Sequence, residues 1–352
     1  MTLANQHDTI LTAHLAVQTD FPMRALNTLG IEAVAHAFLP INSVADLQLV
    51  RSDPDLSQLP RLILGGGSNV VLTRDFPGLV LHIRNQGIQV VGEDADAVTI
   101  RAAAGESWHS LVEWTLAHGL GGLENLSLIP GNVGAAPIQN IGAYGVEMQD
   151  RFHSLTAFDF MTGEMLTLRR ENCAFGYRDS IFKHALRDRA VVIDVTFSLP
   201  KRWQADVRYG DITDELVAHG IVKPDPRDIS NAVIAIRTRK LPDPAVIGNA
   251  GSFFKNPIIP AVQRNALLAQ HPSLVSYQQA DGSFKLAAGW LIDQCGWKGK
   301  ALGRVAMYQK QALVLVNLGD ASGQDVVRLS EAVRADVMAR FGVLLEPEPI
   351  FV

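Results

Sequence analysis

The chain has 352 residues, which at about 150 residues per domain allows about two to three domains. Apolar residues make up 47% of it and charged residues 19%, a balance typical of globular proteins that excludes disorder as the main state. The net charge is -5 and no Lys/Arg cluster occurs along the sequence. A basic footprint for a nucleic-acid backbone is therefore excluded, and we expect no nucleic-acid partner.

The N-terminal sequence lacks the pattern of a secretory signal, because its first basic residue is Arg24. No apolar run approaches the ~18 to 20 residues that a membrane span requires. We therefore expect a cytoplasmic protein with no membrane partner. The two cysteines, Cys173 and Cys295, are far apart and have no second Cys or His at ligand spacing. They are expected to be buried thiols, and neither a disulfide nor a metal site is predicted.

Strands dominate the predicted elements of the first two thirds of the chain. Short runs rich in branched residues, bounded by Gly, Pro, Asp or Asn, predict strands over residues 62–64, 80–83, 98–100 and 191–195. A helix is predicted from Trp108 to His118, because its apolar residues recur at helical spacing, Ser107 can cap its start and Gly119 its end. A second helical pattern covers residues 229–239.

The segment from Lys240 to Pro244 is predicted to be a boundary, since two prolines in three residues cannot continue a helix. A compact α+β module is expected after it. Its predicted elements are helices over 261–270, 287–295 and 325–341 and a strand over 312–316. The last helix has an apolar stripe from Val326 to Phe341 and a stop at Gly342.

Two glycine-rich stretches could bind a ligand through the backbone. The first, Gly65-Gly66-Gly67-Ser68-Asn69, follows a predicted strand, and its glycines can present N–H groups to an anion such as a pyrophosphate. It is not a dinucleotide-binding fingerprint, because Val70 replaces the last glycine and more strand follows. Taken alone, it could equally be a strand-to-strand hairpin without a ligand.

The second stretch runs from Leu128 to Gly145 as LIPGNVGAAPIQNIGAYG. It is rich in small residues and prolines yet largely apolar, which indicates a segment that lies against a large flat ligand rather than a solvated loop. With the first glycine loop, it resembles the flavin-binding half of the UDP-N-acetylenolpyruvoylglucosamine reductase (MurB) family, which has the vanillyl-alcohol-oxidase-type FAD-binding fold. Four further motifs match this family in order: Asn27–Ile31, Phe175–Ser180, Gly248–Pro257 and Leu345–Glu348.

The resemblance implies three catalytic residues. The family's catalytic arginine falls on Arg178, where a fixed guanidinium could bind a carboxylate and stabilise negative charge developing beside it. Its proton donor falls on Ser252, and Lys255 or Asn256 could assist by spacing alone. Its catalytic glutamate falls on Glu348. Without the resemblance, these would be read as an arginine paired with Asp179, a turn cap and an exposed acid.

Ligand-binding residues follow from the same resemblance. The tyrosine of the type I branch, which closes over bound UDP, falls on Tyr209, and the positions that contact the diphosphate fall on Arg237, Lys240 and Asn256. FAD-binding positions are assigned to Gly65, Gly67, Ser68, Asn69, Gly131, Gln139, Gly142, Ala143 and Tyr144. The chain departs from many relatives at Gly66, often acidic, and at Ala135-Ala136, often hydroxyl residues. FAD is still expected, held more by backbone N–H groups.

The resemblance implies an α+β fold, with a two-part flavin domain of the PCMH/VAO type followed by a C-terminal α+β substrate-binding domain. The expected parts are residues 1–85 with a returning strand at 344–352, residues 86–236, and residues 237–343. The expected activity is NADPH-dependent, FAD-mediated reduction of UDP-N-acetylglucosamine enolpyruvate to UDP-N-acetylmuramate, by a cytoplasmic enzyme expected to be a monomer. Two alternatives stay open: a flavin oxidase of the same fold, and a nucleotide-sugar binding module that has lost catalysis.

Overall fold

The computed structural model describes residues 9–12 and 15–352, and the chain forms two compact units. Unit 1 takes in the described residues up to Phe21, Val34–Gly67 and Phe76–Arg239. Unit 2 comprises Pro22–Ala33, Ser68–Asp75 and Lys240–Val352. The boundary after Arg239 coincides with the start of the predicted Lys240–Pro244 boundary.

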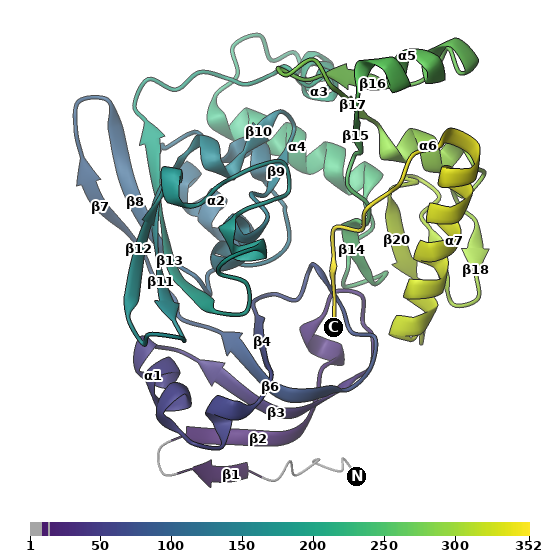
Figure 1. The fold of residues 1–352 in the computed structure, drawn as a ribbon. Coiled ribbons are helices and arrows are strands. Elements are labelled where there is room, and N and C mark those ends of the chain that lie inside the picture. Colours follow the sequence, from purple (N-terminus) through teal and green to yellow (C-terminus); the bar gives the residue numbers. More distant parts are fainter. Residues whose placement is uncertain (1–8, 13–14) are drawn as a thin grey trace, which may run out of the picture. The chain divides into compact units, whose positions relative to one another are not determined.

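Unit 1 contains two five-stranded sheets (Figure 1). The first has the order β1-β2-β3-β6-β4: β1 (Thr9–Thr12), β2 (Leu15–Pro22), β3 (Val34–Ile41), β6 (Phe76–Ile83) and β4 (Arg61–Leu64). In it β6 pairs in parallel with both β3 and β4, while β1 and β2 are antiparallel. The second has the order β12-β11-β13-β8-β7 and is antiparallel throughout: β12 (Met165–Arg169), β11 (Phe152–Asp159), β13 (Ala190–Pro200), β8 (Ala97–Ala103) and β7 (Ile88–Glu93).

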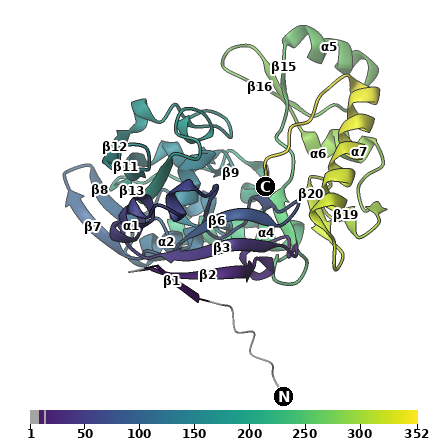
Figure 2. The same ribbon diagram turned by 60° about the horizontal axis from the view of Figure 1, so that its bottom comes forward.

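One hydrophobic core connects these sheets, running from Leu15 in the first to Leu199 in the second. The first sheet is accompanied by α1 (Val44–Ser52), whose start is fixed by a capping box between Ser43 and Asp46 (Figure 2). Division of residues 1–236 into two parts at residue 85 stays a prediction, although each sheet falls within one of the predicted parts.

Helix α2 (Trp108–Ala117) contributes to the core of unit 1 and contacts residues 133–138 of the second glycine-rich stretch. Ser107 caps its start by accepting from the Ser110 N–H, as predicted, and Gly119 follows its end at φ +72. Trp108 is fully buried and packs edge-on against Phe197 of β13, with ring centroids 5.8 Å apart. The remaining elements of unit 1 are β9 (Gly142–Ala143), β10 (Val146–Glu147), α3 (Gly210–Ala218) and α4 (Pro226–Lys240).

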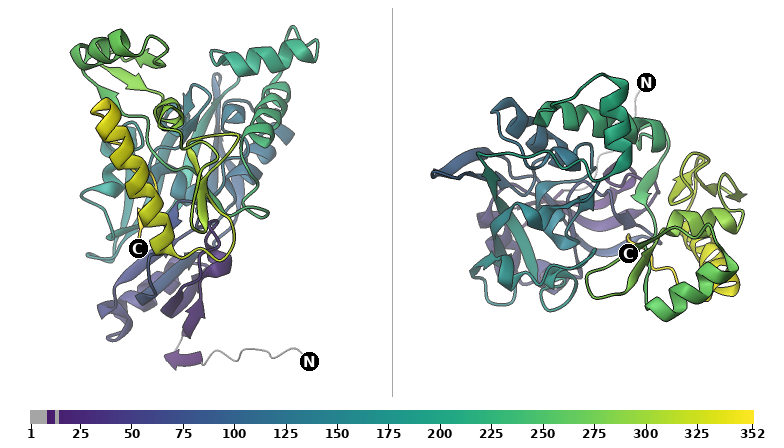
Figure 3. Two further views of the ribbon diagram at one scale, coloured as in Figure 1. Left: turned by 90° about the vertical axis from the view of Figure 1, so that its right-hand side faces the viewer. Right: turned by 90° about the horizontal axis from the view of Figure 1, so that it is seen from above.

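Unit 2 is built on a four-stranded sheet of order β14-β20-β19-β18: β14 (Asn249–Ser252), β20 (Val314–Asn317), β19 (Val305–Met307) and β18 (Ala301–Leu302). Helix α7 (Gly323–Phe341) packs on β19 and on α6 (Ala288–Gln294). The left view of Figure 3 shows α7 in yellow. A capping box at Ser322 starts α7, and Gly342 ends it at φ +62, as the sequence predicts. A three-stranded sheet with one helix completes this region: β15 (Ile258–Ile259), β17 (Phe284–Leu286), β16 (Ser276–Gln278) and α5 (Ala261–Gln270).

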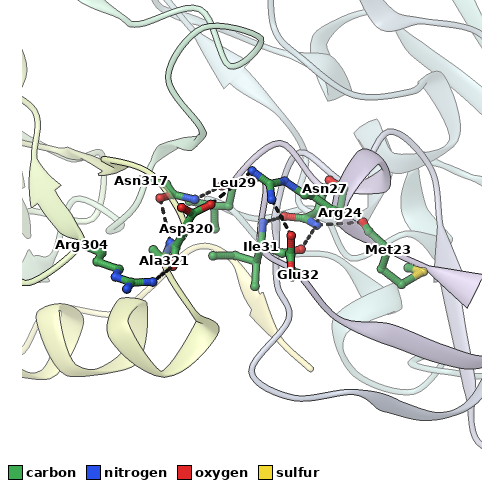
Figure 4. Close-up of polar contacts among 10 residues, drawn as sticks. All are labelled: Met23, Arg24, Asn27, Leu29, Ile31, Glu32, Arg304, Asn317, Asp320 and Ala321. Carbon is green, nitrogen blue, oxygen red and sulfur yellow. Dashed lines mark hydrogen bonds and ion pairs between the residues drawn. The ribbon is translucent and has the colours of Figure 1, made fainter. Parts of the chain in front are cut away.

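Two segments from early in the chain belong to unit 2. The final strand β21 (Ile350–Phe351) pairs in parallel with β5 (Val70–Val71), so the predicted returning strand joins the residues that follow the glycine loop. The 22–33 segment folds around the buried amide of Asn27, which donates to the carbonyls of Met23 and Ile31 at 2.9 Å (Figure 4). The side chain of Asn317 holds this segment by donating to the Leu29 carbonyl at 2.8 Å.

Candidate functional site

The two glycine-rich stretches meet in unit 1 at Gly65–Gly66 and Gly131–Asn132. A Cβ on Gly66 would lie 2.7 Å from Oδ1 of Asn132 and 3.1 Å from Cα of Gly131, so no larger residue fits without displacing the neighbouring loop. Gly67 has φ +60, a conformation that favours glycine. Asn132 is itself fixed, because its amide donates to the Gly105 carbonyl at 2.6 Å. Two backbone segments therefore approach closely, as a site that holds a ligand by main-chain groups requires.

The loop changes unit between Gly67 and Ser68. In unit 2, Asn69 donates from its amide to the carbonyl of Glu348 at 3.3 Å, and its own carbonyl accepts from the Ile350 N–H at 3.0 Å. Asn69, predicted to bind FAD, is thus bonded to the segment that carries the predicted catalytic glutamate.

The rest of the second stretch is irregular and strained. Residues 133–138 form a 3-10 helix, and β9 and β10 make a tight hairpin around Tyr144 and Gly145. Asn140 and Tyr144 both have positive φ, +45 and +50, which side chains other than glycine seldom adopt. Gln139, Gly142 and Ala143 are each partly exposed on this segment. Ala136 is buried whereas Ala135 is exposed, so only one of the two departures at this point faces the protein interior.

The side chain of Asn140 organises this segment, and the sequence reasoning missed it. It is fully buried, and its amide donates to the Glu147 carboxylate at 2.8 Å and to the Gly176 carbonyl at 3.1 Å. Its Oδ1 accepts from the Gln149 N–H at 3.1 Å. Asn140 therefore joins the second glycine-rich stretch to the turn that carries Arg178. Its signal in the sequence was an Asn inside a glycine-rich run, where left-handed backbone favours Asn.

Arg178 lies in a tight turn closed by two backbone hydrogen bonds between Gly176 and Asp179, at 3.0 and 3.3 Å. Its φ is +54, which costs about 1 kcal/mol or more for a residue with a Cβ. The guanidinium donates to the Gly142 carbonyl at 2.7 Å and lies 5.3 Å from the ring centroid of Tyr177. The Asp179 carboxylate bonds the His184 ring, at 2.8 Å.

A second group of unit 1 surrounds the hairpin at Tyr144. The Tyr144 ring packs edge-on against Tyr209, with centroids 5.2 Å apart, and its hydroxyl interacts with the Arg237 guanidinium. Burial raises the pKa of Tyr144 to about 12, although the Arg237 charge opposes the shift. Burial also lowers the pKa of Arg237, whose Nε is buried and makes no hydrogen bond within the part of the chain described. Tyr209 is exposed and precedes α3, and Lys240 is the last residue of α4.

A buried pair of polar residues holds the segment before Tyr209, and it too was missed from the sequence. The Glu124 carboxylate accepts from the indole N–H of Trp203 at 2.7 Å. The Asn125 amide donates to the carbonyl of Asp206 at 2.9 Å and to that of Tyr144 at 3.2 Å. Both residues are buried, at 3% and 1% exposure. Adjacent polar residues beside the Gly121-Gly122 turn were the available signal.

In unit 2 the predicted proton donor and the predicted glutamate lie on neighbouring segments. The Glu348 N–H donates to the Phe253 carbonyl at 2.9 Å, and Phe254 and Pro347 form a β-bridge. Ser252 ends β14 and is partly exposed, whereas Glu348 is 9% exposed. The exposed-acid alternative therefore does not describe Glu348.

The two residues considered as helpers of Ser252 have other contacts. The Lys255 ammonium forms an ion pair with Glu346 at 3.0 Å. Asn256 accepts from the N–H of Ala288, the first residue of α6, at 2.9 Å. Asn256 thus caps a helix, and each of these contacts fixes the chain on either side of the Ser252 segment.

Comparison with known proteins agrees with the arrangement along the chain. The family described as UDP-N-acetylenolpyruvoylglucosamine reductase, C-terminal domain, matches residues 243–352, and the family described as FAD binding domain matches residues 36–169. Among similar curated proteins, the UDP-N-acetylenolpyruvoylglucosamine reductase of Burkholderia vietnamiensis is 56% identical over 339 residues, covering 96% of this chain and 97% of the relative. That of an Azoarcus species is 56% identical over 342 residues, with 96% and 98% covered.

Among solved structures, the MurB of Thermus caldophilus superposes with a TM-score of 0.66 at 23% identity. The match covers 96% of this chain and 98% of the other. These comparisons confirm the predicted fold class, an α+β flavin-binding region followed by a C-terminal α+β domain.

Proposed function

The chain belongs to the UDP-N-acetylenolpyruvoylglucosamine reductase (MurB) family, and from this premise we propose that it reduces UDP-N-acetylglucosamine enolpyruvate to UDP-N-acetylmuramate with NADPH and FAD. It is an FAD-dependent oxidoreductase of peptidoglycan precursor synthesis. The observation that carries the proposal is identity of 56% over 96% of the chain, which includes the FAD-binding and C-terminal regions alike. The binding module without catalysis is thereby not favoured.

The residues present fit FAD. The close approach of Gly66 to Gly131 and Asn132 leaves backbone rather than side chains at the meeting of the two glycine-rich stretches, which suits a diphosphate. We assign binding of FAD to Gly65, Gly67, Ser68, Asn69, Gly131, Gln139, Gly142, Ala143 and Tyr144. Bound FAD supplies a group that accepts a hydride from NADPH and delivers it to the enolpyruvyl substrate.

Three residues are assigned to the chemistry on the substrate. Arg178 binds the enolpyruvyl carboxylate and stabilises the negative charge that develops when hydride reaches the terminal methylene carbon. Ser252 donates the proton to the carbon that bears the ether oxygen. Glu348 stabilises the intermediate, and its burial next to the Ser252 segment supports a role at the reacting group rather than at the surface.

The nucleotide half of the substrate is assigned to Tyr209, Arg237, Lys240 and Asn256. The buried guanidinium of Arg237 supports this assignment, because burial lowers its pKa and the group that acts on its charge is the tyrosine Tyr144 rather than a carboxylate. A diphosphate would supply the missing countercharge. Because the protein carries a net charge of -5, each cation at a site for anionic ligands is important for binding them.

The setting of the reaction is part of the proposal. We place the enzyme in the cytoplasm as a monomer that acts without a nucleic-acid or membrane partner. The net charge of -5 supports the first exclusion. In the described part of the chain, no helix is both long and apolar enough to cross a membrane. Sedimentation of the FAD-loaded protein tests the monomeric state.

The experiment that tests the function separates its two half-reactions. Ser252→Ala should leave reduction of the flavin by NADPH within about twofold of wild type and should slow reoxidation by the enolpyruvyl substrate by orders of magnitude. Stopped-flow absorbance of the flavin measures both rates. Ser283→Ala is the matched control, since Ser283 lies in an exposed turn where its hydroxyl bonds to Asp281.

Two results would contradict the proposal. Equal loss of both half-reactions in Ser252→Ala would remove the proton-donor role from this residue. A wild-type protein that is colourless after reconstitution with FAD, or whose reduced flavin reacts rapidly with oxygen and not with the enolpyruvyl ether, would instead favour the alternatives of a binding module or an oxidase.

A further inference from the structure

We propose that Lys183 is a positioning residue for Arg178, holding its peptide group in the conformation that aims the guanidinium. The Lys183 ammonium donates to the Arg178 carbonyl at 2.9 Å. This inference rests on the role proposed above for Arg178. Lys183 lies outside the residues assigned above to the substrate and to FAD.

The need for such a contact follows from the turn itself. Gly176 and Asp179 exchange two backbone hydrogen bonds, so Tyr177 and Arg178 are the central residues of a four-residue turn. The second central residue has φ +54, where glycine or asparagine is usual. An arginine in this place tends to leave the left-handed region, and rotation of its carbonyl would accompany that change. A cationic donor on the carbonyl opposes the rotation.

Lys183 can act as a fixed donor because its own backbone is anchored. It ends a 3-10 helix, Ile181–Lys183, that is capped by the Ser180 hydroxyl and carries the buried Phe182. The same hydroxyl donates to the Ile138 carbonyl at 2.7 Å, and this bond joins the helix to the second glycine-rich stretch. The lysine therefore extends from a short helix that has an anchor of its own outside the turn, the Ile138 carbonyl.

The atom that Lys183 contacts indicates what the contact can do. Its ammonium bonds the peptide carbonyl of Arg178 at 2.9 Å, so it acts on the orientation of that peptide group. The arrangement is accounted for if the gain is conformational, with a single orientation of the guanidinium selected before substrate binds.

The test compares Lys183→Met, which keeps the length of the side chain and removes the donor, with Lys183→Arg, which keeps a cationic donor. We expect Lys183→Met to slow flavin reoxidation by the enolpyruvyl substrate roughly tenfold, with NADPH reduction and FAD content within about twofold of wild type. Lys183→Arg should recover most of the lost rate. Lys201→Met is the matched control, because Lys201 bears an ion pair to Glu93 in the same unit.

A double-mutant cycle distinguishes positioning from an independent role. If Lys183 acts through Arg178, Lys183→Met should cause no further loss in an Arg178→Ala background. Additive losses, or equal slowing of both half-reactions, would overturn the inference. So would a wild-type reoxidation rate in Lys183→Met. If Arg178→Ala itself reoxidises normally, the failure belongs to the proposed role of Arg178 and is recognised by that variant alone.

Discussion

Gly66 lies where a side chain would separate the two glycine-rich stretches. Its place is enclosed by Gly131 and Asn132, and a Cβ would lie 2.7 Å from Oδ1 of Asn132. Gly66→Ala should therefore push the two glycine-rich stretches apart and lower FAD affinity about tenfold or more, while the protein stays folded. Isothermal titration of the apoprotein with FAD measures the change.

Gly92→Ala provides the matched control for that substitution. Gly92 lies in β7, and a Cβ there would make only an ordinary contact, 3.7 Å from Cβ of Thr99. Its FAD affinity should equal that of wild type. Unchanged affinity in Gly66→Ala would show that the meeting of the two stretches does not contribute to the cofactor site.

At this scale the resemblance supplied most of what the residues alone could not. Without it, Arg178 and Ser252 are an ordinary surface arginine and a turn serine. The structure adds that Arg178 has a positive φ. It also adds that the Glu348 N–H bonds the carbonyl of Phe253, the residue after Ser252. The hydrogen-bond partners of Asn140 and Asn125 could not be identified from the sequence, because they lie up to 81 residues away. Local spacing carries no information about such contacts.

Among the elements, the end of β11 is joined to the residue before β13 by an ion pair. The Asp159 carboxylate is 1% exposed and accepts two hydrogen bonds from Arg189, at 2.6 and 2.9 Å. Its hydrogen bond to Arg189 lowers the pKa of Asp159 to about 2. Because this value lies below the usual 3.8, the pair stabilises the fold above about pH 4 and the contribution is lost as the pH falls towards 2.

Asp159→Asn should reveal that contribution. We expect it to lower the free energy of unfolding by about 2 kcal/mol at about pH 7, and its difference from wild type should shrink as the pH falls below about 4. Urea denaturation at several pH values measures both effects. The control is Glu113→Gln, which breaks a half-exposed ion pair to Arg227 and should cost less than about 1 kcal/mol. A constant difference across the acid range would contradict the assignment.

Elements with local signals were predictable, and those defined by distant partners were not. Helices α2 and α7 were expected within two residues of their observed ends, because caps and apolar spacing are encoded locally. Helices α1 and α3 were not predicted. Among the described strands, the two-residue strands β5 and β21 pair only with each other. The hydrogen bond beside them, from Asn69 to the Glu348 carbonyl, joins residues 279 positions apart in the chain, and no local pattern specifies such a pairing.

In the molecule as a whole, unit 2 is assembled from three separate parts of the sequence. The chain passes from one unit to the other after Phe21, Ala33, Gly67, Asp75 and Arg239. The early parts are joined to the rest of unit 2 by hydrogen bonds, among them Thr28 to the Asn249 carbonyl at 2.7 Å. Domains that are continuous in sequence cannot describe this arrangement. The motif at Asn27–Ile31 belongs to unit 2 although it lies in the first tenth of the chain.

The discontinuity leads to a prediction about fragments. A fragment of residues 240–352 contains the C-terminal family match but lacks the 22–33 and 68–75 segments. It would lose β5, the partner of β21. It would also expose Gly248, which in the intact chain packs so closely on the Leu29 carbonyl that a Cβ would lie 2.4 Å from that oxygen. Unpaired strand edges and lost burial both disfavour an independent fold.

We therefore expect the 240–352 fragment to show no cooperative unfolding transition by circular dichroism, and poor dispersion of its amide resonances. A fusion that supplies residues 22–33 and 68–75 through flexible linkers should restore a cooperative transition, because it replaces the missing hydrogen-bond partners without adding any of unit 1. The matched control carries Asn27→Ala in the supplied segment, which removes the amide that holds the turn and should abolish the rescue. Cooperative unfolding of the bare fragment would mean that its own core suffices and that the early segments are only attached to it.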